Sequence, residues 1–212
     1  MPYTRLQRRV ELKRKTELKR VTALRANKKA RAAEKKKSLT TRDWKKFCDI
    51  CFEFYIRWRD NWIDGIDGKI YQPGDYEHYH ACHYISRGSL ATRYLDINCH
   101  GQSSGHNYAM SPKAPTRVRR NMEKLYRAFM IKTYGEQEVL ELESRENEIC
   151  RRTDYDWYMQ ARECFGKAAR LDSARLLERL HKLYKTTVQK RTLELIQQKL
   201  SGDYNAEKQL SQ

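Results

Sequence analysis

The sequence predicts an α+β protein with a small strand–turn–strand–helix core, a predominantly helical remainder and a basic N-terminal arm. Three observations lead to this fold class. Residues 1–46 carry 18 Lys and Arg against 4 Asp and Glu, and so hold most of the net charge of +17. Five of the six histidines lie between residues 78 and 106. After residue 122, apolar residues recur at helical spacing. The expected regions are the arm over 1–39, the core over 40–135 and a helical region over 136–212.

The arm is expected to be largely disordered alone and to bind a polyanion, because it combines high positive charge with few apolar residues. Its leucines recur every six residues from Leu6 to Leu24, a period that places them on different sides of a helix. We therefore expect an extended chain over 1–22 and a basic helix over 23–37 that forms on DNA. The alternative is a solubilising tail. The residues expected to contact phosphates are Lys13, Arg14, Lys19, Arg20, Lys28 and Lys29.

An amphipathic helix is expected next, capped by Thr40 or Thr41 and running to Trp58, because apolar and aromatic residues recur along it every three or four positions. Cys48 and Cys51 fall on its apolar face. Such a CxxC pair can form half of a zinc site, but the sequence has no second CxxC. Free cysteines are commonly buried, so we expect this pair to pack in the core.

The core follows a Gly- and Asp-rich loop or short hairpin over residues 60–74. Short strands are expected over 79–86 and 92–98, joined by a turn, with a helix that begins near Ser103. Residues 111–115 read as a surface loop. Further helices are expected over 122–134, 137–150 and 154–166, and a long one from Asp172 through Val188.

The histidines and asparagines of the core indicate metal-assisted hydrolysis, since imidazole can take up a proton near neutral pH and both groups can ligate a cation. The expected unit would bring residues about 25 apart into one cleft, and these residues are His80, His83, Asn98, His106 and Asn107. The combination fits a ββα-metal (HNH-like) core. In that arrangement a neutral histidine deprotonates water, an asparagine orients this histidine, and one divalent cation neutralises charge at the phosphate.

Several segments also carry a family resemblance, and these are residues 55–60 (YIRWRD), 81–88 (ACHYISRG), 90–94 (LATRY), 98–102 (NCHGQ), Asn107 and 132–135 (KTYG). Together with the repeated Leu-Lys-Arg units of the arm, they resemble the NinG (Rap) family of lambdoid-phage recombination endonucleases over about residues 5–145. The resemblance implies an HNH-like core that cuts branched DNA. It implies His83 as general base, Asn98 as the central asparagine and Asn107 as a metal ligand. We expect Asn107, together with His80 or His106, to hold Mg²⁺ or Mn²⁺.

The chain departs from the family pattern at the expected zinc cysteines. The second pair falls on Ser103 and His106, and the first pair falls near Asp64 and Asp67. Structural zinc is therefore not expected, and a noncanonical Asp/Asp/His site is the alternative. Cys82 occupies the position before the base, where a soft thiol is a poor ligand for Mg²⁺. We expect His80 or water to take that place.

Arginines flank the candidate base. Arg87 and Arg93 are candidates for clamping phosphates, with a solvated turn as the alternative. A second basic cluster, formed by Arg117, Arg119 and Arg120, could hold one duplex arm of a junction while the N-terminal arm holds another.

The expected activity is a metal-dependent endonuclease that hydrolyses phosphodiester bonds in branched DNA recombination intermediates, of the Holliday-junction or D-loop type. The alternatives are a non-catalytic basic DNA-binding protein with a degenerate nuclease core, and an RNA-binding or phage-assembly factor. Cleavage of both strands at a junction would suggest a homodimer. No apolar run approaches the length of a membrane span, so we expect a cytoplasmic location and reduced cysteines.

Overall fold

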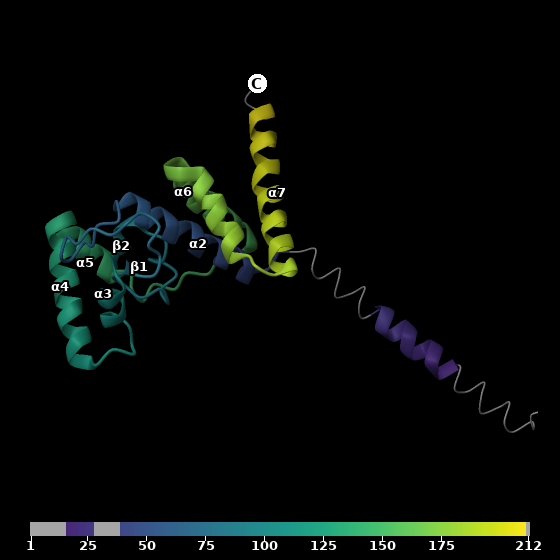
Figure 1. Ribbon diagram of the computed structural model, residues 1–212, viewed down its shortest axis with the longest axis horizontal. Helices are drawn as coiled ribbons and strands as arrows, with labels where there is room; N and C mark the ends of the chain where they lie inside the picture. Colours follow the sequence, from purple (N-terminus) through teal and green to yellow (C-terminus); the bar gives the residue numbers. More distant parts are fainter. Residues whose placement is uncertain (1–15, 28–38, 211–212) are drawn as a thin grey trace, which may run out of the picture. The chain divides into compact units, whose positions relative to one another are not determined.

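The computed structural model describes residues 16–27 and 39–210, with side chains in the last helix described to Gly202 (Figure 1). The chain divides into two units, Met1–Thr40 and Thr41–Gln212. Each unit is described by itself. Among the described residues no helix is both long and apolar enough to span a bilayer.

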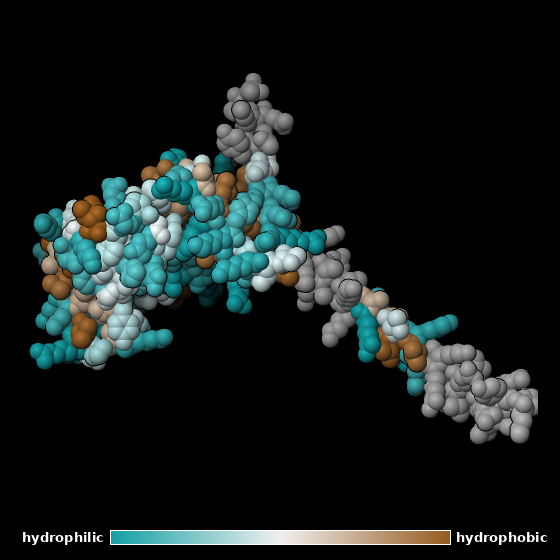
Figure 2. Space-filling view, in the orientation of Figure 1, coloured by the Kyte–Doolittle hydropathy of each residue, from teal (hydrophilic) through white to brown (hydrophobic). Residues whose placement is uncertain are grey.

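In the first unit, residues 16–27 form a helix. The prediction of an extended chain is therefore wrong for residues 16–22, because a run of good helix formers outweighs the six-residue leucine period. Leu18 and Leu24 are 70% and 61% exposed on this helix, which leaves its apolar side chains unpacked (Figure 2). Lys19 and Arg20 lie on it, exposed. The other predicted contacts of the arm lie outside the described residues, namely Lys13, Arg14, Lys28 and Lys29.

Helix α2 (Thr41–Arg59) is the support of the second unit, as predicted. Its buried face includes Trp44, Phe47 and Phe52. Cys48 and Cys51 are free thiols with no exposed surface. They belong to no cluster of metal-ligating side chains among the described residues. Their predicted role in packing is confirmed.

Strands β1 (Tyr79–His83) and β2 (Cys99–Ser103) form a two-stranded antiparallel sheet in which Tyr79 pairs with Ser103 and His83 with Cys99. β1 lies within the predicted first strand. The prediction of a strand over 92–98 is wrong, because that segment is a turn followed by the 3₁₀-helix η1 (Asp96–Asn98). Its amides are satisfied locally: the nitrogen of Leu95 donates to the carbonyl of Thr92 at 3.1 Å.

The segment before β1 is the predicted short hairpin, closed by an isolated antiparallel bridge between Ile63 and Ile70. It is fastened to the sheet through Tyr79, whose buried hydroxyl donates to the carbonyl of Ile63 at 2.8 Å. Gly101 on β2 makes this packing possible, because a Cβ at that position would overlap the hydroxyl of Tyr79.

The sheet is covered on both faces. α2 packs on the face of His83, whose ring lies 6.1 Å from that of Phe52. α3 (Ser104–Ala109) and α4 (Thr116–Tyr134) cover the other face, where the buried Tyr126 donates to the carbonyl of Cys82 at 2.7 Å. α5 (Glu136–Ser144) adds Val139 to the same apolar cluster. Residues of α3 are therefore in direct contact with β1.

The start of α4 and the end of α5 differ from prediction. α4 begins at Thr116, six residues before the expected start, because Pro115 stands at its N-cap and favours helix initiation there. α5 ends at Ser144, six residues early. The predicted end of α4 at Gly135 is confirmed. This residue has a φ of 89°, a conformation that glycine adopts readily because it has no side chain.

α6 (Asp154–Leu183) is two helices joined at Asp172, which has non-helical backbone angles, in agreement with the predicted start there. The expected helix through Val188 ends early, and α7 (Thr187–Leu210) begins separately. A cap explains the break: the nitrogen of Gln189 donates to the hydroxyl of Thr186 at 3.3 Å, and the Gln189 side chain accepts from the Thr186 nitrogen. α6 packs along α2 and joins the C-terminal helices to the core.

Candidate functional site

A cleft of about 960 Å³ runs beside β1, between α2 and the α3–α5 region. His80 and His83 from β1, Asn107 from α3 and Arg87 from the β1–β2 connection all line it. The structure therefore brings together four of the residues that the sequence singled out. Acidic residues also line this cleft, and they are Glu53, Glu123, Glu143 and Glu146.

His83 is held in one orientation. Its Nε2 lies 2.9 Å from the carbonyl oxygen of Arg93, and because a carbonyl only accepts, Nε2 carries the proton. Nδ1 is then the nitrogen with the lone pair, and it faces the thiol of Cys99 at 3.7 Å. Burial, with some help from the nearby cations Arg87 and Arg93, lowers the pKa of His83 to about 4. The ring is neutral at pH 7.

The side chain of Asn98 holds together the loop that leads to the Arg93 carbonyl, the acceptor of the His83 hydrogen bond. It is fully buried in η1, accepts from the nitrogen of Ile85 at 2.7 Å, and donates to the carbonyls of Ile85 and Thr92 at 3.1 Å each. Asn98 therefore does not touch His83. It fixes both ends of the 85–92 segment, and through the next residue, Arg93, it sets the position of the oxygen that orients the imidazole.

Arg93 is anchored inside the protein. Its Nε and Nη2 donate to the two carboxylate oxygens of Asp49 on α2, at 2.9 and 2.7 Å, and its side chain is 7% exposed. Tyr94 donates to the same carboxylate at 2.8 Å. The guanidinium predicted to clamp a phosphate is thus engaged with Asp49. Arg87 differs, because its side chain is 55% exposed at the cleft and pairs with Glu53 at 3.1 Å.

Asp49 was not singled out from the sequence. The one available signal is that it stands between Cys48 and Cys51, on a helix whose face is buried. A carboxylate beside an apolar face needs a cationic or hydrogen-bonding partner, but its identity cannot be read from a linear sequence, since Arg93 lies 44 positions away.

His80 and Asn107 meet across the cleft. The side-chain nitrogen of Asn107 lies 3.1 Å from Nδ1 of His80, and Nε2 of His80 lies 3.1 Å from the carbonyl of Glu77. Nε2 therefore carries the proton and Nδ1 is an acceptor. Burial, followed by the charge of Arg57, lowers the pKa of His80 below its usual value. A neutral imidazole and a carboxamide oxygen in this position could hold a divalent cation.

His106 is not part of that pair. Neighbouring residues on a helix point about 100° apart, and His106 turns toward the buried Asp64, with Nδ1 and Oδ2 2.8 Å apart. The same carboxylate accepts from the nitrogens of Ser103 at 2.6 Å and Ile66 at 2.8 Å. Of the two histidines predicted as alternative partners of Asn107, the structure therefore brings His80 to it and not His106. We call Asp64, Ser103, His106 and the adjacent Asp67 the Asp64 cluster.

The Asp64 cluster lies where the resemblance implied zinc cysteines, and ligand atoms of Asp64, Asp67 and His106 lie within 4.8 Å of one another. It does not fit a structural zinc ion. Such sites use four sulfur or nitrogen ligands, whereas both oxygens of Asp64 are engaged by hydrogen-bond donors and Asp67 accepts from the nitrogen of Lys69 at 2.9 Å. The hydrogen bonds themselves join the hairpin to α3.

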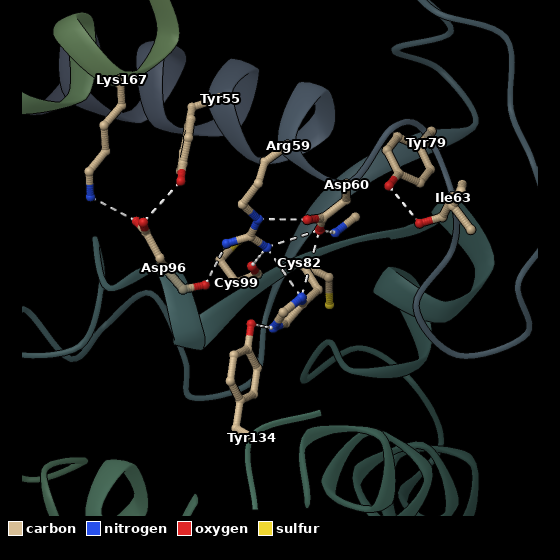
Figure 3. Close-up of polar contacts among 12 residues, drawn as sticks. Tyr55, Arg59, Asp60, Ile63, Tyr79, Cys82, Asp96, Cys99, Tyr134 and Lys167 are labelled. Atoms are coloured by element: carbon tan, nitrogen blue, oxygen red, sulfur yellow. Dashed lines mark hydrogen bonds and ion pairs between the residues drawn. The ribbon is translucent and has the colours of Figure 1, made fainter. Parts of the chain in front are cut away.

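A second polar network, partly buried, fastens α2 to β2 (Figure 3). Arg59 donates to both oxygens of Asp60 and to the carbonyls of Asp96 at 2.8 Å and Cys99 at 2.7 Å. Asp60 also accepts from the nitrogen of Gly101 at 2.7 Å. Although burial opposes ionisation, the neighbouring His100 ring and the hydrogen bonds and charge of Arg59 hold the pKa of Asp60 below its usual value.

The outer part of this network reaches α4 and α6 (Figure 3). Tyr134 lies 3.2 Å from Nε2 of His100. Tyr55 and Lys167 each contact the carboxylate of Asp96 at 2.9 Å. Residues from the YIRWRD, NCHGQ and KTYG segments thus meet in one structural brace behind the cleft.

The second predicted basic cluster lies at the start of α4. Arg117 and Arg120 are exposed, and Arg119 is 3.5 Å from Glu123 in an ion pair. These arginines do not line the cleft of His83.

Comparison with known proteins identifies one family. The family described as "Bacteriophage Lambda NinG protein" matches residues 2–172. No curated protein and no solved structure matches the chain. The match covers far more than half of the 212 residues and includes β1, β2, α3 and the whole cleft. The chain therefore belongs to the bacteriophage lambda NinG family.

Proposed function

We propose that the protein is a divalent-metal-dependent endonuclease that hydrolyses phosphodiester bonds in branched DNA recombination intermediates. The observation that carries the proposal is a neutral, oriented imidazole, His83, lining the same cleft as the His80–Asn107 pair. Membership of a recombination-related phage family supports the choice of substrate.

In this proposal His83 removes a proton from water through Nδ1, the nitrogen left basic by the bond from Nε2 to the Arg93 carbonyl. The hydroxide attacks phosphorus and the leaving oxygen departs. Asn98 keeps the imidazole in place through the loop that it closes. Arg87 is placed to contact a phosphate oxygen when it leaves Glu53.

A flip of the Asn107 carboxamide would turn its oxygen toward His80 and free the lone pair of Nδ1. Nδ1 of His80 and that oxygen would then hold Mg²⁺ or Mn²⁺ in this cleft. A bound cation would neutralise charge on the phosphate and on the leaving oxygen. Mn²⁺ accepts an imidazole ligand more readily than Mg²⁺ does, so we expect the higher activity with Mn²⁺.

One contact favours a second candidate, a non-catalytic DNA-binding protein with a degenerate core. Nδ1 of His83 faces Cys99, whose thiol keeps its proton because burial raises its pKa well above the usual value. To act as a base, the imidazole must give up this contact. A sulfur hydrogen bond is weak, so the contact is a small obstacle to catalysis.

The test compares cleavage of a synthetic four-way junction and a linear duplex with Mg²⁺ and with Mn²⁺. His83→Ala is expected to lower the cleavage rate at least about a hundredfold, the usual contribution of a general base, and to leave junction binding unchanged. His78→Ala is the matched control, because that histidine is 63% exposed and does not line the cleft.

Cleavage that persists in His83→Ala would exclude this base. Absence of wild-type cleavage with every divalent cation, combined with intact DNA binding, would favour the non-catalytic protein. Tighter binding to RNA than to either DNA would favour the RNA-binding alternative.

A further inference from the structure

A second hollow, of about 700 Å³, lies at the start of α6 and the connection before it. Four arginines line it, and they are Arg151, Arg152, Arg162 and Arg170. Two acidic side chains share the lining, Asp156 and Glu163, but both have local partners. Asp156 accepts from the nitrogen and hydroxyl of Thr153 at 2.7 Å each, and Glu163 pairs with Lys167 at 2.9 Å.

Two of these arginines are exposed at the hollow. The side chain of Arg151 has no hydrogen bond or ion pair to any residue that the structure describes. Arg170 donates its Nε to the carbonyl of Gly166 at 3.1 Å, and its exposed side chain keeps its terminal N–H donors for a ligand. Arg151 and Arg170 therefore bring to the hollow positive charge that no carboxylate pairs with among the described residues.

Arg152 connects this hollow to the 85–92 segment. It donates to the carbonyl of Leu90 at 3.2 Å and to Gln160 at 2.9 Å, and it lies over the ring of Trp157 at 5.1 Å. The connection before α6 is thus fixed against the segment that Asn98 holds in place.

A third hollow, of about 480 Å³, joins the other two. It shares Ile85, Ser86 and Glu146 with the cleft of His83. It shares Cys150 with the arginine-lined hollow. The three hollows therefore adjoin one another between His83 and Arg170, and we call them together the groove.

We propose that this groove binds the phosphate backbone of a DNA strand that extends out of the cleft, with Arg151 and Arg170 as phosphate contacts. The inference rests on the proposed function for the identity of the polyanion. Guanidinium groups suit this ligand because their planar N–H donors match phosphate oxygens. Glu146, at the junction of the hollows, opposes the bound strand through its charge.

Binding of the full-length chain to a four-way junction, measured as a function of salt, tests the groove. Each lost phosphate contact lowers the slope of log K against log salt by about 0.9. Arg151→Gln/Arg170→Gln is therefore expected to lower the slope by about 2 and to weaken binding. Glu146→Gln is expected to strengthen binding.

Lys190→Gln/Arg191→Gln on α7 is the matched control, because it removes the same charge from exposed residues that line none of these three hollows. An equal loss of slope in the two double variants, or an unchanged slope in both, overturns the groove. Cleavage by His83→Ala is scored separately, so failure of the base and failure of the groove are distinguishable.

Discussion

At the scale of single residues, the buried neutral state of His83 has a consequence for stability. Its pKa is about 4 in the folded protein against about 6.5 in the unfolded chain. The unfolded chain therefore binds a proton first as pH falls. This contribution to stability is fully present above pH 6.5 and is lost as pH falls toward 4, by about 3 kcal/mol at most.

We expect His83→Gln to flatten the pH dependence of the free energy of unfolding between pH 6.5 and 4. Urea denaturation followed by tryptophan fluorescence at several pH values measures it. His78→Gln, at a histidine that is 63% exposed, should leave the pH dependence as it is in the wild type. An unchanged slope in His83→Gln would show that the imidazole is not held neutral by burial.

Asp49 is expected to position the candidate base without touching it. Asp49→Asn removes the charge that balances the buried guanidinium of Arg93, and since Asp49 is 26% exposed we expect a loss of about 2 kcal/mol. The Arg93 carbonyl then loses its fixed place, so the imidazole nitrogens of His83 should show mixed tautomers by ¹⁵N NMR. Asp75→Asn is the control, because that carboxylate pairs with the exposed His78. A single His83 tautomer in Asp49→Asn would contradict the positioning role.

At the scale of elements, sequence periodicity predicted α2 and the break at Asp172, because long amphipathic helices depend on local spacing. The second strand was misplaced since Asn98 bonds two backbone segments, a contact that no local pattern records. The grouping of His83, His80 and Asn107 in one cleft was predictable, because it depends on the order of the strand and the helix along the chain. The partner of Arg93 was not predictable, because Asp49 lies on another element.

Because the hydrogen bonds of the Asp64 cluster join the hairpin to α3, we expect this junction to be stable without zinc. A chelator should leave the thermal unfolding midpoint of the protein unchanged. Asp64→Asn should lower the free energy of unfolding by about 2–3 kcal/mol, because a fully buried carboxylate that accepts three hydrogen bonds loses its charge. Asp67→Asn, at an exposed carboxylate, is the matched control. Stabilisation of the wild type by added Zn²⁺ that disappears in Asp64→Asn would instead show a metal site.

At the scale of the whole molecule, the proposed catalytic residues and most of the excess positive charge lie in different parts of the chain. The cleft is lined by four glutamates and by only two arginines, Arg57 and Arg87. The excess positive charge is concentrated in the first 46 residues. A substrate phosphate that enters the cleft therefore meets carboxylates, which favours a requirement for a divalent cation and for binding energy supplied elsewhere.

Deletion of residues 1–40 separates these two contributions, because that segment forms its own compact unit. All four tryptophans lie after residue 40, so their fluorescence reports on the second unit alone. We expect an unchanged midpoint of thermal unfolding together with a large loss of DNA affinity and a smaller salt dependence, since most phosphate-neutralising charge is gone. Junction cleavage at saturating DNA should persist, because His80, His83 and Asn107 all lie in the retained unit. A lowered midpoint would mean that the arm also packs on the core, and unchanged affinity would place the polyanion site in the helical region instead.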